Sequence, residues 1–140
     1  RLQSMRAVQL DPIAVPFSDN TVKLAGVHWK DNGTTVIDLI SKGSGRRARV
    51  EFLDDCGLRI LDELDLASMW IGAVPGVFEK TWLFEVHAGG WFDLEATRHD
   101  FYTKHESPIR EFLVTGYREC VSILSRLEPT IVEMDAALDV

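Results

Sequence analysis

The stretch that decides the fold is residues 21–53, TVKLAGVHWKDNGTTVIDLISKGSGRRARVEFL. Its Asn32-Gly33 pair lies between two apolar runs, which is the strongest short-range signal for a hairpin of two antiparallel strands. In the third run charged and apolar residues alternate, so one face of that strand is buried and the other is exposed. The residues concerned are Val50 and Phe52, predicted to be buried, and Arg47 and Arg49, predicted to be exposed. The stretch therefore predicts a three-stranded antiparallel meander.

Further strands are predicted along the rest of the chain, where short apolar runs are separated by turn residues. They span residues 58–61 (after a turn over 54–57), 80–87, 91–94, 110–115, 119–124 and 130–134. Residues 62–71 predict a short helix, because acidic residues begin it and apolar residues recur at roughly helical spacing. Residues 95–106 fit either helix or loop.

The connections between these strands are short, and short connections favour antiparallel neighbours because a parallel pair needs a long crossover. We therefore expect a mainly β (α+β) fold with one or two short helices. Its antiparallel sheet is curved into a half-barrel or a sandwich, and the helix over 62–71 covers one edge or end.

The 140 residues fit one domain with a single hydrophobic core. Its expected parts are residues 1–4 left over from cloning, an irregular lead-in over 5–20, a core over 21–134 and a fraying tail over 135–140. No uncharged stretch reaches the roughly 18 residues of a membrane span, and no signal-peptide pattern opens the chain. We therefore expect a soluble cytoplasmic protein, with no membrane partner, whose Cys56 and Cys120 are buried thiols, reduced and unpaired.

Charge is divided unevenly along the chain, whose net charge is −7. Residues 1–50 contain eight Lys and Arg against four Asp and Glu, whereas residues 51–106 contain four against twelve. A protein of this balance repels nucleic-acid phosphates, so we expect no nucleic-acid partner.

The densest acidic run lies within residues 54–65, where Arg59 is the only basic residue. These acids cap turns and a helix start in one interpretation; in the other they form a face that attracts a basic protein. Trp70 follows at the end of the predicted helix, where we expect it to reach the surface as an aromatic contact. If the strand over 58–61 is short, both acidic ends lie on one rim of the sheet. The candidate partner-binding residues are Asp54, Asp55, Asp62, Glu63, Asp65 and Trp70.

Three segments carry a family resemblance: GGWFDLE at 89–95, REFLVTG at 110–116 and ECVSILS at 119–125, with Pro129 beyond them. Together they resemble small acidic bacterial proteins of the immunity-protein type, which are encoded beside polymorphic or contact-dependent toxins. The resemblance implies a non-enzymatic inhibitor that binds one cognate toxin domain, many such toxins being basic. It transfers no functional residue, because the similar positions are those of strands and turns.

Two alternative functions stay open. The first is a half-barrel that binds a small ligand in a cavity lined by Trp82, Phe84, Trp91 and Phe112. The second is a metal-dependent hydrolase that uses the acids and histidines between His87 and His105, although their spacing matches no established template. These side chains are His87, Asp93, Glu95, His99, Asp100 and His105, with Glu106 just beyond. The favoured function needs no cofactor, no metal and no catalytic residue.

Overall fold

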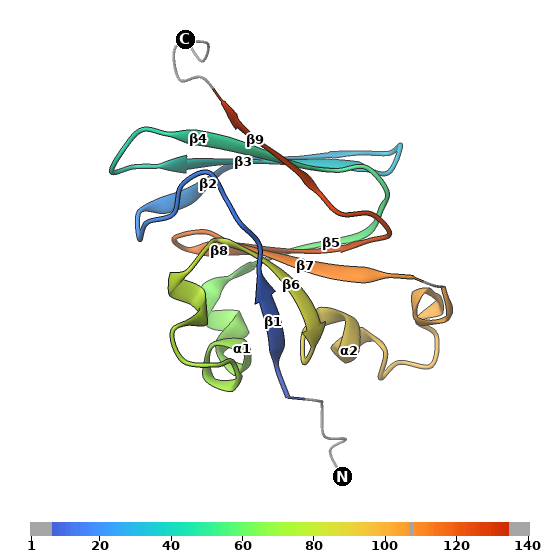
Figure 1. Ribbon diagram of the computed structural model, residues 1–140. Helices are drawn as coiled ribbons and strands as arrows, with labels where there is room; N and C mark the ends of the chain where they lie inside the picture. The colour runs from blue at the N-terminus through green and yellow to red at the C-terminus, as the bar shows by residue number, and fades with distance from the viewer. Residues whose placement is uncertain (1–6, 107, 135–140) are drawn as a thin grey trace.

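The computed structural model describes residues 7–106 and 108–134, apart from the side chains of Ala67, Ser68 and Ile71. The expectations for residues 1–4 and for the tail over 135–140 concern residues outside these ranges. Two antiparallel sheets lie face to face, and the helices cover the outer side of the larger sheet (Figure 1). The prediction of a mainly β fold is confirmed, in its sandwich form. No helix in the described ranges is long and apolar enough to cross a membrane.

The strands are β1 (Gln9–Pro12), β2 (Val22–Lys30), β3 (Thr34–Ser41), β4 (Arg47–Phe52), β5 (Asp55–Asp62), β6 (Leu83–Ala88), β7 (Arg110–Thr115), β8 (Glu119–Ser125) and β9 (Thr130–Met134). The α-helices are α1 (Ala67–Gly72) and α2 (Trp91–Glu95), and the 3-10 helices are η1 (Glu63–Leu66), η2 (Val77–Glu79) and η3 (Tyr102–His105).

The smaller sheet has the strand order β2-β3-β4-β9 and contains the predicted meander. Gly33 has a positive φ of 84° in the β2–β3 turn, a conformation that favours glycine. Val50 and Phe52 are completely buried, Arg49 is exposed and Arg47 is half-buried. The period-2 pattern therefore predicted the buried face of β4 and the exposure of Arg49, because a slip of one residue would reverse the two faces, whereas Arg47 is less exposed than predicted.

The larger sheet has the order β1-β6-β7-β8-β5. Two predictions for it were wrong. The lead-in contains a strand, β1, which pairs antiparallel with β6 despite Pro12 because it lies at the sheet edge. Strand β5 is eight residues long, since it begins at Asp55 inside the predicted turn. The extra residues pair with β8, and the register shifts between Asp55 and Gly57. This irregularity allows the turn-like sequence to remain within the strand.

The segment predicted as a strand over 91–94 is the helix α2, which is a third correction. The buried Glu111 carboxylate accepts the backbone N–H groups of Trp91 and Phe92, both at 2.8 Å. A Cβ at Gly90 would lie 2.5 Å from that carboxylate, so the close approach requires glycine. A carboxylate on β7 therefore satisfies two free amides of the first helical turn, and that partner cannot be seen from the local sequence.

The hydrophobic core fills the space between the sheets, where Phe52 of β4 meets Phe112 of β7 at a ring distance of 5.5 Å. A second cluster packs the outer face of the larger sheet against Leu66, Met69 and Val77. The segment predicted as a helix over 62–71 forms η1 followed by α1, and it covers this face rather than an edge.

Candidate partner-binding site at the acidic end

The candidate acidic residues do not share one rim. Strand β5 separates Asp55 from Asp62 by seven residue steps, which is about 23 Å along an extended strand. The condition for a single rim, a short strand over 58–61, is not met. Asp54 and Asp55 therefore lie at one end of the strand, and Asp62, Glu63 and Asp65 lie at the other.

Asp54 and Asp55 are engaged in contacts that hold the fold. The Asp54 carboxylate forms an ion pair with Arg126 at 3.4 Å, and its carbonyl accepts the Arg126 backbone N–H at 3.1 Å. The Asp55 carboxylate accepts the Thr35 hydroxyl at 3.0 Å, which ties β5 to the other sheet. Both residues are only partly exposed. Both carboxylates are therefore engaged within the fold, although the second Asp55 oxygen, Oδ1, is buried without a hydrogen-bond partner among the described residues.

Four exposed carboxylates gather at the other end, which we call the acidic end: Asp62, Glu63, Asp65 and Glu119. Asp62 pairs directly with Glu119 across β5 and β8, and the Glu63 N–H donates to the Arg118 carbonyl at 2.7 Å. None of the four carboxylates forms an ion pair with the described residues. Glu119 was missed at the sequence level, because its nearness to Asp62 depends on the pairing of two strands far apart in the chain.

Two exposed apolar side chains accompany the acidic end. Leu64 is 78% exposed between Glu63 and Asp65 in η1, and Tyr117 is 62% exposed in the β7–β8 turn beside Glu119. Asp62 shapes this segment, because its carboxylate accepts the Leu64 N–H at 2.9 Å. The arrangement combines apolar contact area with surrounding charge, as protein interfaces do.

Trp70 has a different role from the predicted surface contact. Its indole is half-buried, packs edge-on against Phe78 at 4.4 Å and donates its N–H to the Glu63 carbonyl at 2.6 Å. The tryptophan therefore holds the backbone of the acidic end in position.

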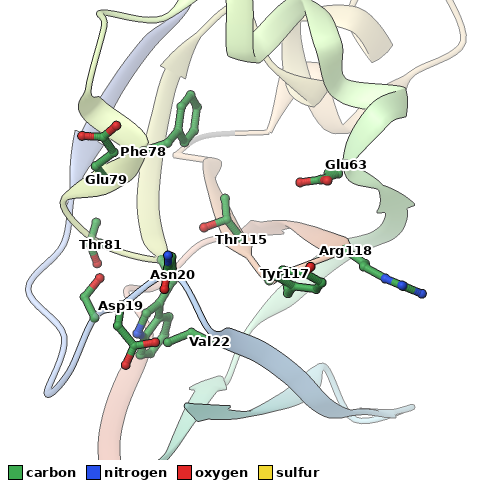
Figure 2. A pocket seen from close by; sticks show the side chains of 13 residues that line it. Asp19, Asn20, Val22, Glu63, Phe78, Glu79, Thr81, Thr115, Tyr117 and Arg118 are labelled. Atoms are coloured by element: carbon green, nitrogen blue, oxygen red, sulfur yellow. The ribbon is translucent and has the colours of Figure 1, made fainter. Parts of the chain in front are cut away.

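A cleft lies beside the acidic end, where the start of β2 faces the β7–β8 turn (Figure 2). It consists of two adjoining cavities of about 530 and 570 Å³, which share Asn20, Tyr117 and Arg118. Glu63 lines the first cavity and Glu119 lines the second. We call it the end cleft.

The four aromatic residues proposed for a ligand cavity do not line one cavity. Trp82 and Phe112 belong to the core between the sheets, and Phe84 packs on the opposite face of the larger sheet. Trp91 lies under the Arg59 guanidinium at 5.1 Å, on that same outer side. The sheet therefore separates side chains that the strand pattern had grouped together.

The acids and histidines between His87 and His105 are also dispersed. His87 pairs with Asp11 at 2.7 Å, Asp93 accepts the Gly89 N–H at 2.8 Å, and Arg98 binds Glu95 and Asp100. His99 and His105 are exposed, and Glu106 forms an ion pair with Arg126. Within the described ranges, no three His, Cys, Asp or Glu side chains are grouped as a metal site requires.

Both cysteines are free thiols. Cys120 is buried, and burial raises its pKa to about 12. Cys56 is exposed, contrary to the expectation of a buried thiol, and its pKa is raised mainly by partial burial of the sulfur and further by Glu106, Asp55 and Asp54. Neither thiol has the lowered pKa of an activated nucleophile.

A comparison of the chain with protein-family models, with curated proteins and with solved structures finds no match.

Proposed function

We propose that the protein is a non-enzymatic inhibitor of the immunity type, which neutralises a cognate bacterial toxin domain by binding a basic surface of that domain at its acidic end. The observation that carries the proposal is the cross-strand pair of like charges, Asp62 and Glu119, neither of which forms an ion pair with a described residue.

Like charges directly opposite each other on neighbouring strands destabilise a sheet. Glu63 and Asp65 add two further unpaired carboxylates next to this pair. A basic partner relieves the repulsion between the carboxylates when it binds. This relief contributes favourably to the free energy of binding. The negative electrostatic potential of the acidic end also accelerates the encounter with a basic protein and disfavours acidic partners.

Leu64 and Tyr117 supply the apolar part of this interface. Aromatic residues are enriched at the centres of protein interfaces, where burial of their rings contributes much of the affinity. Tyr117 also has a hydroxyl group that can stay hydrated or bond to the partner. We assign these two residues the contact role that the sequence had suggested for Trp70.

The test measures association and dissociation rates with the toxin domain encoded beside the gene of this protein. The variant is Glu119→Lys, and the matched control is Asp31→Lys, an exposed acid of the β2–β3 turn that gives the same change in net charge. We expect Glu119→Lys to slow association about tenfold at low salt, with little change for the control. Equal rates for both variants would place the interface elsewhere, and the lack of any complex with the wild type would contradict the function.

A further inference from the structure

The two cavities of the end cleft carry opposite charge. The first is lined by Asp19, Glu63 and Glu79, and the second by Lys23, Lys42 and Glu119. Arg118 lines both, but its side chain points away from the first cavity in Figure 2, whereas the Glu63 side chain is directed toward it. One half of the cleft is therefore acidic and the other half is predominantly basic.

The three carboxylates of the acidic half differ in their contacts. The Asp19 carboxylate accepts hydrogen bonds from Ser41 and Thr21, both at 2.6 Å, and these bonds lower its pKa. Glu63 and Glu79 are exposed, and their carboxylates have no hydrogen-bond partner among the described residues. Asp19 is thus a fixed negative charge, while the two glutamates are free to bind a ligand.

The walls of the first cavity suit a long side chain with a charged head. Val22, Phe78 and Trp82 line it together with the hydroxyl-bearing residues Thr81 and Thr115. Lysine and arginine bury their aliphatic stems on apolar surface and keep the charged group at a polar rim. A cavity of about 530 Å³ is within the size range of ligand pockets, so it has room for one such side chain.

We propose that the end cleft binds one loop of the partner, with a lysine or arginine side chain in the first cavity and an acidic side chain paired with Lys23 and Lys42 in the second. Glu119 lines the second cavity but keeps its role in the acidic end, where it faces the basic surface of the partner. This inference rests on the proposed function and names the feature that the partner must present. A uniformly acidic surface attracts any basic side chain. Adjoining cavities of opposite charge are more selective, because they also disfavour a loop in which a second basic side chain stands where the acidic one should be.

The test uses nuclear magnetic resonance titration of the full chain with the blocked peptide acetyl-Arg-Gly-Gly-Glu-amide. Saturable shifts of the Trp82 indole N–H and of the backbone amides of residues 115–119 report occupation of the cleft. The neutral analogue acetyl-citrulline-Gly-Gly-Gln-amide is the control peptide, because it keeps the shape and removes both charges.

Two pairs of variants distinguish binding in the cleft from a general effect of net charge on the affinity for the peptide. Glu63→Gln and Lys42→Gln each remove one charge from a cavity, while Asp31→Asn and Lys30→Gln remove the same charges from exposed residues that line neither cavity. We expect the affinity for the charged peptide to fall about tenfold in the first pair and to change little in the second. None of these four side chains has a hydrogen-bond partner among the described residues, so the fold is retained.

Absence of saturable binding to the wild type, equal binding of the neutral peptide, or equal losses in both pairs of variants would overturn the inference. The outcome is separable from the proposed function. If the toxin complex forms and is unaffected by Glu63→Gln and Lys42→Gln, the inhibitor function stands and the cleft is not its contact. If the peptide binds as expected but the toxin domain does not, the cleft is a binding site and the proposed function is wrong.

Discussion

Asp62 at the end of β5 and Glu119 at the start of β8 lie directly opposite each other as a cross-strand pair of like charges. Both are exposed, and neither carboxylate forms an ion pair with the described residues. Such a pair lowers the stability of the sheet slightly.

The first prediction is that Glu119→Gln stabilises the free protein. Removal of one charge relieves the repulsion, and because both residues are solvent-exposed we expect a gain of about 0.5 kcal/mol or less. Urea unfolding at low salt measures this gain, which decreases as salt screens the pair. Asp65→Asn is the control, because Asp65 lies outside the sheet and has no like charge across a strand. A loss of stability in Glu119→Gln would contradict the repulsive interpretation.

The second prediction concerns Trp70, whose indole is hydrogen-bonded to the backbone of η1. Trp70→Ala removes the edge-on contact with Phe78 and the hydrogen bond to the Glu63 carbonyl, and we expect a loss of about 2 kcal/mol in the free energy of unfolding. Trp70→Phe keeps most of the packing and loses the hydrogen bond, which costs about 1 kcal/mol. Tyr102→Ala, at an aromatic residue that is 80% exposed, serves as the control and changes stability little. Equal stabilities of the Trp70 variants and the wild type would refute the supporting role.

The third prediction is a pH dependence of stability that arises from Glu111. Burial raises the pKa of this carboxyl group, although the N–H groups of Phe92 and Trp91 and the charge of Arg59 oppose the shift. Because the folded-state pKa lies above the unfolded value, the contribution of Glu111 is fully present below the ordinary glutamate pKa. It is lost as the pH rises through the raised pKa.

The Glu111→Gln variant isolates this contribution. The difference in unfolding free energy between wild type and variant is therefore greatest at acidic pH and decreases toward neutral pH. Urea unfolding at a series of pH values measures it. Glu85→Gln gives a matched comparison of opposite sign, because a hydrogen bond from Arg110 lowers the pKa of Glu85. A constant difference for Glu111→Gln across the range would show that its pKa is not raised.

The fourth prediction concerns the two thiols. Cys56 is exposed and reacts with a thiol reagent in the native protein, slowly at neutral pH because its pKa is raised. Cys120 is buried in the second cluster and reacts after unfolding. Titration without reductant should count one thiol in the native protein and two in denaturant. A count of zero in denaturant would show a disulfide and would contradict the reduced state expected from the sequence.

The sequence by itself determined the parts of the fold that depend on neighbouring residues. The meander over residues 21–53 and the strands over 110–115, 119–124 and 130–134 are present, because alternation and turn residues act over a few positions. The acidic character of residues 62–65, at the end of β5 and in η1, was also predictable, since Asp62, Glu63 and Asp65 are close in the chain.

Tertiary structure decided what depends on distant partners. The segment at Trp91 is a helix because Glu111, 20 residues away, accepts its first free amide. Strand β5 extends through a turn-like sequence because β8 supplies the pairing, and that extension divides the acidic residues that the sequence had grouped. Glu119 reaches Asp62 through the same pairing, and the end cleft is formed by segments from separate parts of the chain. Local propensities are weak compared with the free energy of burial and of satisfying backbone hydrogen bonds, so long-range contacts override them at these positions.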